Sequence, residues 1–352
     1  MSRLRVALDV AHERLSGAGV TRASREMRLA LELRPGVDVV PVGEGPTVER
    51  GAPGRRRLVL QHDLAWYPLG GRRAARRAEA DVYHCPGLRA PVWPGSPPTV
   101  VTIHDLNFLV RPETVSRWNR HYSRATIHRV VASADRIVAS TAATADDVER
   151  LLGVGGDRVR VVHLGVSERF HEPSAADLPA SLARASGYVL FVGTPEPRKN
   201  LARLAEAVAS LRASGREERL VVAGGDGWGG VDRGANDAVL WLGRVSDEEL
   251  RALYASAGCL AIPSLHEGFG LPALEAMASG CPVVASDAGA LPEVCGDAAV
   301  LVDPLSVRSI ADGIAIAIDD GDAFRERGRA RAREFSWTRT AERLEAVYRE
   351  LA

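Results

Sequence analysis

Lysine is almost absent from this sequence of 352 residues: Lys199 stands alone against 44 arginines. Cysteine is scarce as well, and the four present have no paired spacing of the metal-binding or redox kind. We expect them to be reduced, buried thiols of a cytosolic protein. No stretch approaches about 18 consecutive apolar residues, and the first residues lack the apolar core of a signal peptide. These absences predict a chain that is neither exported by that route nor inserted across a membrane.

Metal ligands are also missing from the expected places. The histidines form no metal-ligand spacing, and no Asp-x-Asp motif is expected to hold a divalent cation anywhere in the chain. We therefore expect no metal site, and no cofactor apart from the substrates themselves.

The formal charge is zero overall but unevenly divided. Residues 1–170 hold 26 arginines against 18 acidic residues, and the rest of the chain has the opposite imbalance. The densest arginines are Arg55, Arg56, Arg57, Arg72, Arg73, Arg76 and Arg77. This basic half favours an anionic or membrane-held partner, although a solvated arginine-rich surface would have the same composition. Aromatic residues do not alternate with these arginines, so we do not expect nucleic acid as a partner.

Short β-branched runs alternate with longer amphipathic stretches along the whole chain, which is typical of parallel sheets with crossover helices. The first series of predicted strands lies at residues 5–9, 58–61, 81–85, 99–103, 136–140 and 159–164. The second series lies at residues 188–192, 220–223, 239–242, 259–263, 282–286 and 299–302. Helical spacing is clearest over residues 21–33, 117–132, 142–152 and 201–213. The predicted fold class is α/β, with two doubly wound, Rossmann-like domains.

Between the two series, residues 167–186 lose this periodicity and gather proline, serine and alanine, as a linker does. We therefore predict an N-terminal domain at residues 1–170, a C-terminal domain at residues 171–335 and a final helix at residues 336–352. Ligands of doubly wound sheets lie beyond the carboxyl ends of the strands, so functional residues are expected there.

The most informative segment is 264–280, Ser-Leu-His-Glu-Gly-Phe-Gly-Leu-Pro-Ala-Leu-Glu-Ala-Met-Ala-Ser-Gly. It predicts a strand end, a glycine-bearing turn and a helix that Pro272 opens and Gly280 ends. Such a helix N-terminus favours a phosphate group. A carboxylate beside a phosphate is costly, so Glu267 and Glu275 fit hydroxyls of a sugar or ribose better; solvated carboxylates at a helix end are the plainer alternative.

The second segment is 193–200, Gly-Thr-Pro-Glu-Pro-Arg-Lys-Asn, again between a strand and a helix. Here the chain keeps its single lysine, Lys199, where a compact ammonium would suit a diphosphate. Chance retention of one surface lysine is the alternative.

Weaker signals complete the pattern. Residues 225–230 fit G-x-G-x-x-G, but no helix is predicted after them, so a dinucleotide site is not expected. His104 ends a predicted strand of the first half and would face a cleft between the domains, although strand-end histidines are often structural. Gly17 and Gly19 follow the first strand and would let the backbone approach a ligand.

Together these segments resemble the retaining glycosyltransferases of family 4, which have the two-domain GT-B fold facing a central cleft. The resemblance covers nearly the whole chain. It is carried by the E-x7-E pair Glu267 and Glu275 with the turn Gly268, Phe269, Gly270 and Leu271, and by the motifs at residues 193–200 and 242–250. Residues 102–105 and 17–19 match more loosely.

The resemblance implies a role for each matching position. Lys199 would bind the donor diphosphate, helped by Arg198, because Thr194 stands where many members have an arginine. Glu275 would bind the ribose, Glu267 the transferred sugar, and the backbone near Val245 the base. His104 would touch the sugar or orient the reacting centre, and the final helix would cross back to the N-terminal domain.

The same resemblance implies a metal-independent transferase that retains the anomeric configuration. The motif at residues 193–200 is similar to the branch in which mannosyltransferases are frequent, so GDP-mannose is the expected donor and a glycan, a lipid-linked sugar or a small molecule the acceptor. A UDP-sugar donor, a GT-B epimerase or phosphorylase, and a non-catalytic partner protein are the alternatives.

Overall fold

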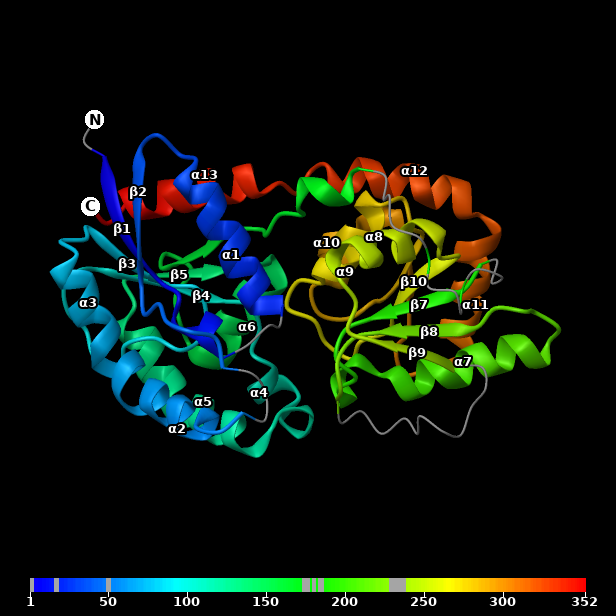
Figure 1. Cartoon of the computed structure of the whole chain (residues 1–352), viewed down its shortest axis with the longest axis horizontal. Helices are drawn as coiled ribbons and strands as arrows, with labels where there is room; N and C mark the ends of the chain where they lie inside the picture. The colour runs from blue at the N-terminus through cyan, green and yellow to red at the C-terminus, as the bar shows by residue number, and fades with distance from the viewer. Residues whose placement is uncertain are drawn as a thin grey trace. The chain divides into compact units, whose positions relative to one another are not determined.

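The computed structural model describes residues 3–15, 19–48, 52–172, 178, 182, 187–227 and 239–352. The chain forms two compact units: the first comprises Met1–Gly165 with Trp337–Ala352, and the second Val166–Ser336. Each unit holds one six-stranded parallel sheet with helices on its faces (Figure 1). The predicted α/β class with two doubly wound domains is confirmed. The division after Gly165 falls five residues before the predicted one, and the final helix groups with the first unit.

The sheet of the first unit has the order β2-β1-β3-β4-β5-β6. Its strands are β1 (Leu4–Asp9), β2 (Val37–Val42), β3 (Val82–Cys85), β4 (Thr99–Ile103), β5 (Arg136–Ala139) and β6 (Val159–Val161). Its helices are η1 (Ala11–Arg14), α1 (Gly19–Glu32), α2 (Arg55–Gln61), η2 (His62–Gly70), α3 (Gly71–Arg77), α4 (Asn107–Val110), η3 (Pro112–Thr114), α5 (Arg117–Ser133), α6 (Ala142–Leu152) and α13 (Trp337–Arg349). The central strands are buried on both faces, which explains why they read as apolar runs.

One predicted strand of the first unit is wrong, and one observed strand was not predicted. Residues 58–61 are helical, because they lie in α2, which continues without a break through η2 into α3. The run Leu-Val-Leu is short enough to suit either structure; Leu58 and Val59 are half-buried here and Leu60 is exposed. The edge strand β2 was not predicted, because Pro41 interrupts its apolar run.

A buried hydrogen-bonded chain ties α13 to the first sheet. Tyr348 of α13 lies 2.7 Å from Nδ1 of His84 on β3, and Nε2 of His84 lies 2.8 Å from the hydroxyl of Thr102 on β4. Burial lowers the pKa of His84 to about 3, so its ring is neutral and uses one nitrogen as donor and one as acceptor. The chain end is therefore held by polar contacts as well as by packing against α1.

The sheet of the second unit has the order β12-β11-β10-β7-β8-β9. Its strands are β7 (Val189–Val192), β8 (Leu220–Ala223), β9 (Val239–Gly243), β10 (Cys259–Ile262), β11 (Val283–Ser286) and β12 (Ala299–Val302). Its helices are η4 (Glu168–Phe170), η5 (Pro197–Lys199), α7 (Leu201–Ala213), α8 (Asp247–Ser256), α9 (Leu271–Ala278), α10 (Leu291–Cys295), η6 (Gly296–Ala298), α11 (Val307–Asp319) and α12 (Gly321–Ala332).

The second unit's core lies between its sheet and the helices α7 and α11. Leu204, Val208 and Ile314 of these helices cover Phe191, Val222 and Val284 of the strands. The helix α9 packs against two other helices of the same unit, α8 and α12. The capping box predicted for the helix at Asp247 is present, with Ser246 and Glu249 exchanging hydrogen bonds.

All four cysteines are buried as free thiols. Burial raises the pKa of Cys281 and Cys295 to about 12, so both stay protonated at neutral pH. No helix in the described ranges has both the length and the apolar composition that crossing a bilayer requires.

Replacing Tyr348 by phenylalanine removes the hydroxyl that faces His84 and leaves a buried ring nitrogen without a partner. We expect the free energy of unfolding of the first unit to fall by about 1–3 kcal/mol. Hydrogen exchange of the β3 and β4 amides measures the change. Tyr122→Phe is the control, because that hydroxyl is only partly buried and donates to the carbonyl of Asp63 at 2.9 Å. Equal losses in both variants would contradict a specific role for the His84 contact.

Candidate functional site

The strands β7 and β10 are neighbours in the second sheet although β8 and β9 come between them in the chain. The direction of winding reverses at this pair. Ligands of doubly wound sheets bind at such a switch point, beyond the carboxyl ends of the strands. Residues 193–200 follow β7 and residues 263–270 follow β10, so the two most informative segments of the sequence meet there.

Asn200 joins these two segments. Its backbone is in the left-handed region (φ 60°), which asparagine tolerates better than most residues. The buried side-chain amide donates to the carbonyl oxygens of Pro263 at 2.9 Å and Pro304 at 2.7 Å. The amide of Leu265 also donates to the carbonyl of Arg198 at 2.8 Å. The residues just before Asn200 are therefore fixed against the loop after β10.

Both cations of the first segment point at one carboxylate of the second. Lys199 Nζ lies 2.6 Å from Glu267 Oε1, and Arg198 Nη1 lies 2.7 Å from Glu267 Oε2. Arg198 also donates to the carbonyl of His266 at 2.9 Å. The buried hydroxyl of Ser264 completes the arrangement by donating to Glu267 Oε1 at 2.8 Å. We call Arg198, Lys199, Ser264 and Glu267 the cation cluster.

The electrostatics of the cation cluster favour its charged form. Burial by itself raises the pKa of Glu267, but the charges of Arg198 and Lys199 outweigh it and bring the pKa to about 2. Glu267 is therefore ionised at neutral pH. Arg198 has a second, weaker carboxylate neighbour in Glu196, at 3.7 Å. The two cations are held in place before any ligand arrives, and an anion bound here would find them already oriented.

The predicted glycine turn leads directly into a helix. Gly270 is in the left-handed region (φ 94°), and a Cβ atom there would lie 2.6 Å from a methyl group of Leu291. Leu271 begins α9, Pro272 occupies its first turn, and the chain leaves the helix before Gly280 (φ 73°). Phe269 anchors the turn by packing edge-to-face on Phe335, and Gly268 precedes it. A helix N-terminus therefore starts four residues after Glu267, in keeping with the phosphate site that the sequence predicts.

Glu275 lies on α9, separated from the cation cluster by the turn and the first helical turn. It is only 5% exposed, and one of its oxygens accepts a hydrogen bond from Tyr254 of α8 at 3.2 Å. A ligand of Glu275 would have to reach it through this small remaining surface.

Two glycines after β8 pack directly on the loop after β7. A Cβ atom on Gly224 would overlap the carbonyl of Gly193, and one on Gly227 would overlap the carbonyl of Pro195. Only glycine fits at such approaches. This explains part of the G-x-G-x-x-G pattern without a dinucleotide; its residues 228–230 lie outside the described residues.

The remaining predicted residues of the second unit lie around this edge. Thr194 is half-buried in the loop after β7. Val245 is half-buried between β9 and α8, and β9 stands two strands from β7, roughly 10 Å away. Arg244 beside it lies over Gly225, where a Cβ atom would come within 3.1 Å of its Nε.

His104 belongs to the first unit and is not part of the cation cluster. It follows β4, and its Nε2 lies 3.3 Å from the carbonyl of Pro86. Burial lowers its pKa. Burial, followed by the charge of His104, also lowers the pKa of His12 to about 4, so the two imidazoles are close enough to interact.

The roles of the two glycines near the first strand stay a prediction. Gly19 opens α1, and a Cβ atom there would meet nothing within 4 Å, so no described protein atom requires a glycine. Gly17 lies outside the described residues.

Sequence reasoning missed three polar residues that the structure makes prominent. Ser264 holds Glu267, and Asn200 joins the two loops. Asp9, at the end of β1, is buried and accepts hydrogen bonds from Tyr83 and from the Trp66 indole at 2.9 Å. Burial raises the pKa of Asp9 to about 6. Asp9 ends the strand predicted at residues 5–9. Asn200 and Ser264 lie inside the segments 193–200 and 264–280. Position at a strand end or within a motif is therefore the signal that could have found them.

Within the described ranges, no group of three or more histidine, cysteine, aspartate or glutamate side chains is arranged to hold a metal ion. The expectation that the chain has no Asp-x-Asp is wrong, because Asp320 and Asp322 form one. It lies at the start of α12, and the Asp322 side chain is fully exposed. Metal independence stays a prediction.

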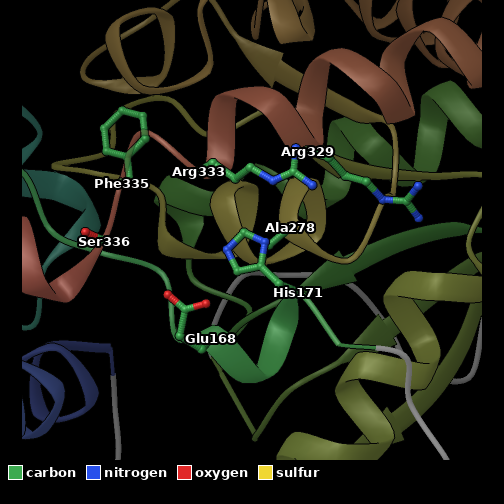
Figure 2. A pocket seen from close by; sticks show the side chains of 7 residues that line it. All are labelled: Glu168, His171, Ala278, Arg329, Arg333, Phe335 and Ser336. Atoms are coloured by element: carbon green, nitrogen blue, oxygen red, sulfur yellow. The ribbon is translucent and has the colours of Figure 1, made fainter.

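A separate pocket of about 220 Å³ lies at the other end of α9. Figure 2 shows Arg329 of α12, Arg333 directly after that helix, His171 and Ala278 around it. Its remaining lining comes from Glu168 and from Phe335 and Ser336, the segments at which the chain enters and leaves the second unit. None of the predicted site residues contributes to it.

In comparisons with known proteins, both units match glycosyltransferase families. The model for Glycosyltransferase Family 4 matches residues 19–170, and the model for glycosyl transferases group 1 matches residues 181–335. The chain is 33% identical to O-antigen chain mannosyltransferase B of Escherichia coli, over 80% of this chain and 78% of that protein. It is 32% identical to a D-inositol 3-phosphate glycosyltransferase of Saccharomonospora viridis, over 98% and 87% respectively.

A similar fold is found in a solved structure, Anabaena Alr3699/HepE in complex with UDP-glucose. The TM-score is 0.72 at 17% identity, and the match covers 99% of this chain and 100% of that one.

Glu267→Gln would keep the shape of the side chain but leave two partly buried cations without their counter-charge. Because the folded pKa of about 2 lies below the ordinary 4.5, the carboxylate stabilises the fold above pH 4.5 and loses this effect as the pH falls toward 2. We expect the variant to lose about 3 kcal/mol of unfolding free energy in the second unit at pH 7. The difference from the native chain should shrink below pH 4.5.

Denaturant titrations at several pH values measure this difference. Glu326→Gln, an exposed position on α12, is the control and should change little. A Glu267→Gln deficit that stays constant down to pH 3 would contradict the proposed ionisation.

Proposed function

Since the chain belongs to the family 4 glycosyltransferases and has their GT-B fold, we propose that it is a retaining mannosyltransferase that uses GDP-mannose. The observation that carries this proposal is the cation cluster: Lys199 and Arg198 are held by Glu267 at the switch point of the second sheet, beside the N-terminus of α9. The proposed acceptor is a glycan, a lipid-linked sugar or a small molecule.

In this proposal the donor diphosphate binds the two cations. Breaking the sugar–phosphate bond leaves negative charge on the departing diphosphate, and cations that are already oriented stabilise that charge without reorganising. The diphosphate would compete with Glu267 for Lys199 and Arg198, and the freed carboxylate would then accept hydrogen bonds from sugar hydroxyls. The amides at Gly268, Phe269, Gly270 and Leu271, and the hydroxyl of Thr194, would add neutral donors.

The resemblance to the family also assigns residues to the other parts of the donor. Glu275 would bind the ribose hydroxyls, with Tyr254 fixing its orientation through their 3.2 Å hydrogen bond. The backbone near Val245 would meet the base. His104 would touch the transferred sugar or orient the reacting centre.

Retention of configuration is part of the proposal. With the leaving diphosphate stabilised by cations, the sugar would form an oxocarbenium-like ion paired with the departing group. The acceptor hydroxyl would attack the face from which the diphosphate leaves, and its proton would pass to the departing diphosphate oxygen. No divalent cation is needed for this step, because Lys199 and Arg198 supply the positive charge.

The choice of mannose rests on likeness rather than on a pocket contact. One relative is a mannosyltransferase by name, another acts on D-inositol 3-phosphate by name, and the similar structure holds UDP-glucose. A UDP-sugar transferase is therefore the second candidate. A non-catalytic partner protein is disfavoured, because Lys199, Glu267 and Glu275 are all retained. Four buried free thiols support a reducing, cytoplasmic location.

Lys199→Ala removes the cation closest to Glu267. We expect kcat to fall by about two to three orders of magnitude, comparable with deleting one preorganised oxyanion donor. Release of nucleoside diphosphate, measured in EDTA, is the assay, and the native enzyme should keep its rate there. Arg212→Ala, in the last turn of α7, is the control. A Lys199→Ala enzyme with normal kcat and a raised KM would show uniform donor binding instead, and a native enzyme that EDTA inactivates and magnesium restores would refute metal independence.

The donor prediction is tested by binding before catalysis. At equal concentration GDP should raise the thermal stability of the chain more than UDP does. GDP-mannose should then be hydrolysed or transferred in preference to UDP-glucose. A tenfold preference for UDP, about 1.4 kcal/mol, would overturn the mannose assignment and leave the role of the cation cluster intact.

A further inference from the structure

The helical segment α2–η2–α3 of the first unit carries exposed leucines along one side. Residues 55–77 continue from one helix into the next, since the junction residues Gln61, His62, Gly70 and Gly71 are all in the right-handed helical region. Leu60, Leu64 and Leu69 are 43%, 66% and 46% exposed, while His62, Asp63 and Tyr67 between them are buried. The segment is therefore amphipathic, with its inner side polar and aromatic and its outer side apolar.

Arginines stand at both ends of this apolar side. Arg56 and Arg57 precede the leucines, and Arg73, Arg76 and Arg77 follow them; all five are exposed. The only acidic residue from 52 to 78 is Asp63, which is buried and paired with Arg89 at 2.6 Å. The outer side is therefore apolar in the middle and positively charged at both ends, without negative charge.

The helix α5 extends this surface. Trp118 of α5 is 48% exposed, and its indole donates to Asp63 Oδ2 at 3.0 Å, so it lies beside η2. The same helix carries the exposed residues Arg117, His121, Arg124 and Arg129, and no acidic residue occurs from 114 to 134. We call the exposed residues Arg56, Arg57, Leu60, Leu64, Leu69, Arg73, Arg76, Arg77 and Trp118 the arginine–leucine face.

We propose that the arginine–leucine face binds the surface of an anionic lipid bilayer. A helix that lies in a membrane interface buries an apolar side at the headgroup level and carries arginine or lysine that pairs with anionic lipids. Tryptophan concentrates at the same level. The long arginine side chains bury their stems and reach the phosphates with their guanidinium groups. A charged protein surface or RNA would pair with the arginines, but neither explains three exposed leucines between them.

The inner side of the same segment reaches the carboxyl edge of the first sheet. Trp66 of η2 donates to Asp9 Oδ2, at the end of β1, at 2.9 Å. The segment that contacts lipid on its outer side therefore helps to form the edge at which a doubly wound sheet binds ligands. If the proposed function holds, this arrangement suits an acceptor whose sugar is carried by a lipid.

The experiment is co-sedimentation with vesicles of phosphatidylcholine alone or of phosphatidylcholine and phosphatidylglycerol in equal parts. We expect at least about tenfold stronger partitioning onto the anionic vesicles, because each arginine near the surface contributes to binding. High salt should weaken it. The combined variant Leu60→Ser, Leu64→Ser, Leu69→Ser should bind these vesicles about tenfold or more weakly.

A matched control is available in the second unit. Leu301, Leu305 and Ile316 are 41%, 60% and 45% exposed, and changing all three to serine should leave vesicle binding unchanged. Equal binding to both kinds of vesicle, equal losses in the two triple variants, or retention on polyuridylic acid with no vesicle binding would each overturn the proposal. Donor hydrolysis without vesicles should be the same in the leucine variant and the native chain, so failure of membrane binding is distinguishable from failure of the enzymatic proposal.

Discussion

The contact between Glu267 and Lys199 is the one on which the arrangement of the second unit's edge depends. A lone buried carboxylate would be neutral or unstable, and two neighbouring cations would repel each other. Joined at 2.6 and 2.7 Å, the three charges stabilise one another and fix the ends of two loops that are far apart in the sequence. The hydrogen bonds of Asn200 and Ser264 then determine where these loops stand. The ion pairs therefore hold the site together, and the hydrogen bonds of the two loops add to them.

This balance also explains why a lysine survives in a chain that otherwise uses arginine. Arg198 spreads its donors between Glu267 and the carbonyl of His266, as a planar guanidinium does. Lys199 needs only a single compact contact, and its side chain runs beside Gly193, where a Cβ atom would lie 3.8 Å from its Cε. A guanidinium at position 199 would be larger and would bring five N–H donors instead of three.

Much of the fold and part of the site could be predicted from the sequence. Central strands such as β4 are fully buried, so their apolar runs are unambiguous, and Ala142–Leu152 and Leu201–Ala213 are helices with the predicted bounds. The run at residues 58–61 was misassigned because three apolar residues fit two periods equally well, and only the context of η2 and α3 decides for a helix. The family resemblance assigned Lys199 and Glu267 to one donor site, but it did not predict their shared ion pair. A motif gives residue types and spacing, whereas the pairing of side chains 68 residues apart depends on how two loops pack.

The hydrogen bond from Tyr348 to His84 has a consequence for the order in which the chain folds during synthesis. The first unit is discontinuous in sequence: the whole of the second unit is inserted between Gly165 and Trp337. Strand β3 is therefore made long before the helix that covers its buried histidine leaves the ribosome. The second unit, continuous and complete by Ser336, is free to fold while the first still exposes the surface that α13 will occupy. During translation that surface, with the ring of His84, stays uncovered until α13 has been synthesised.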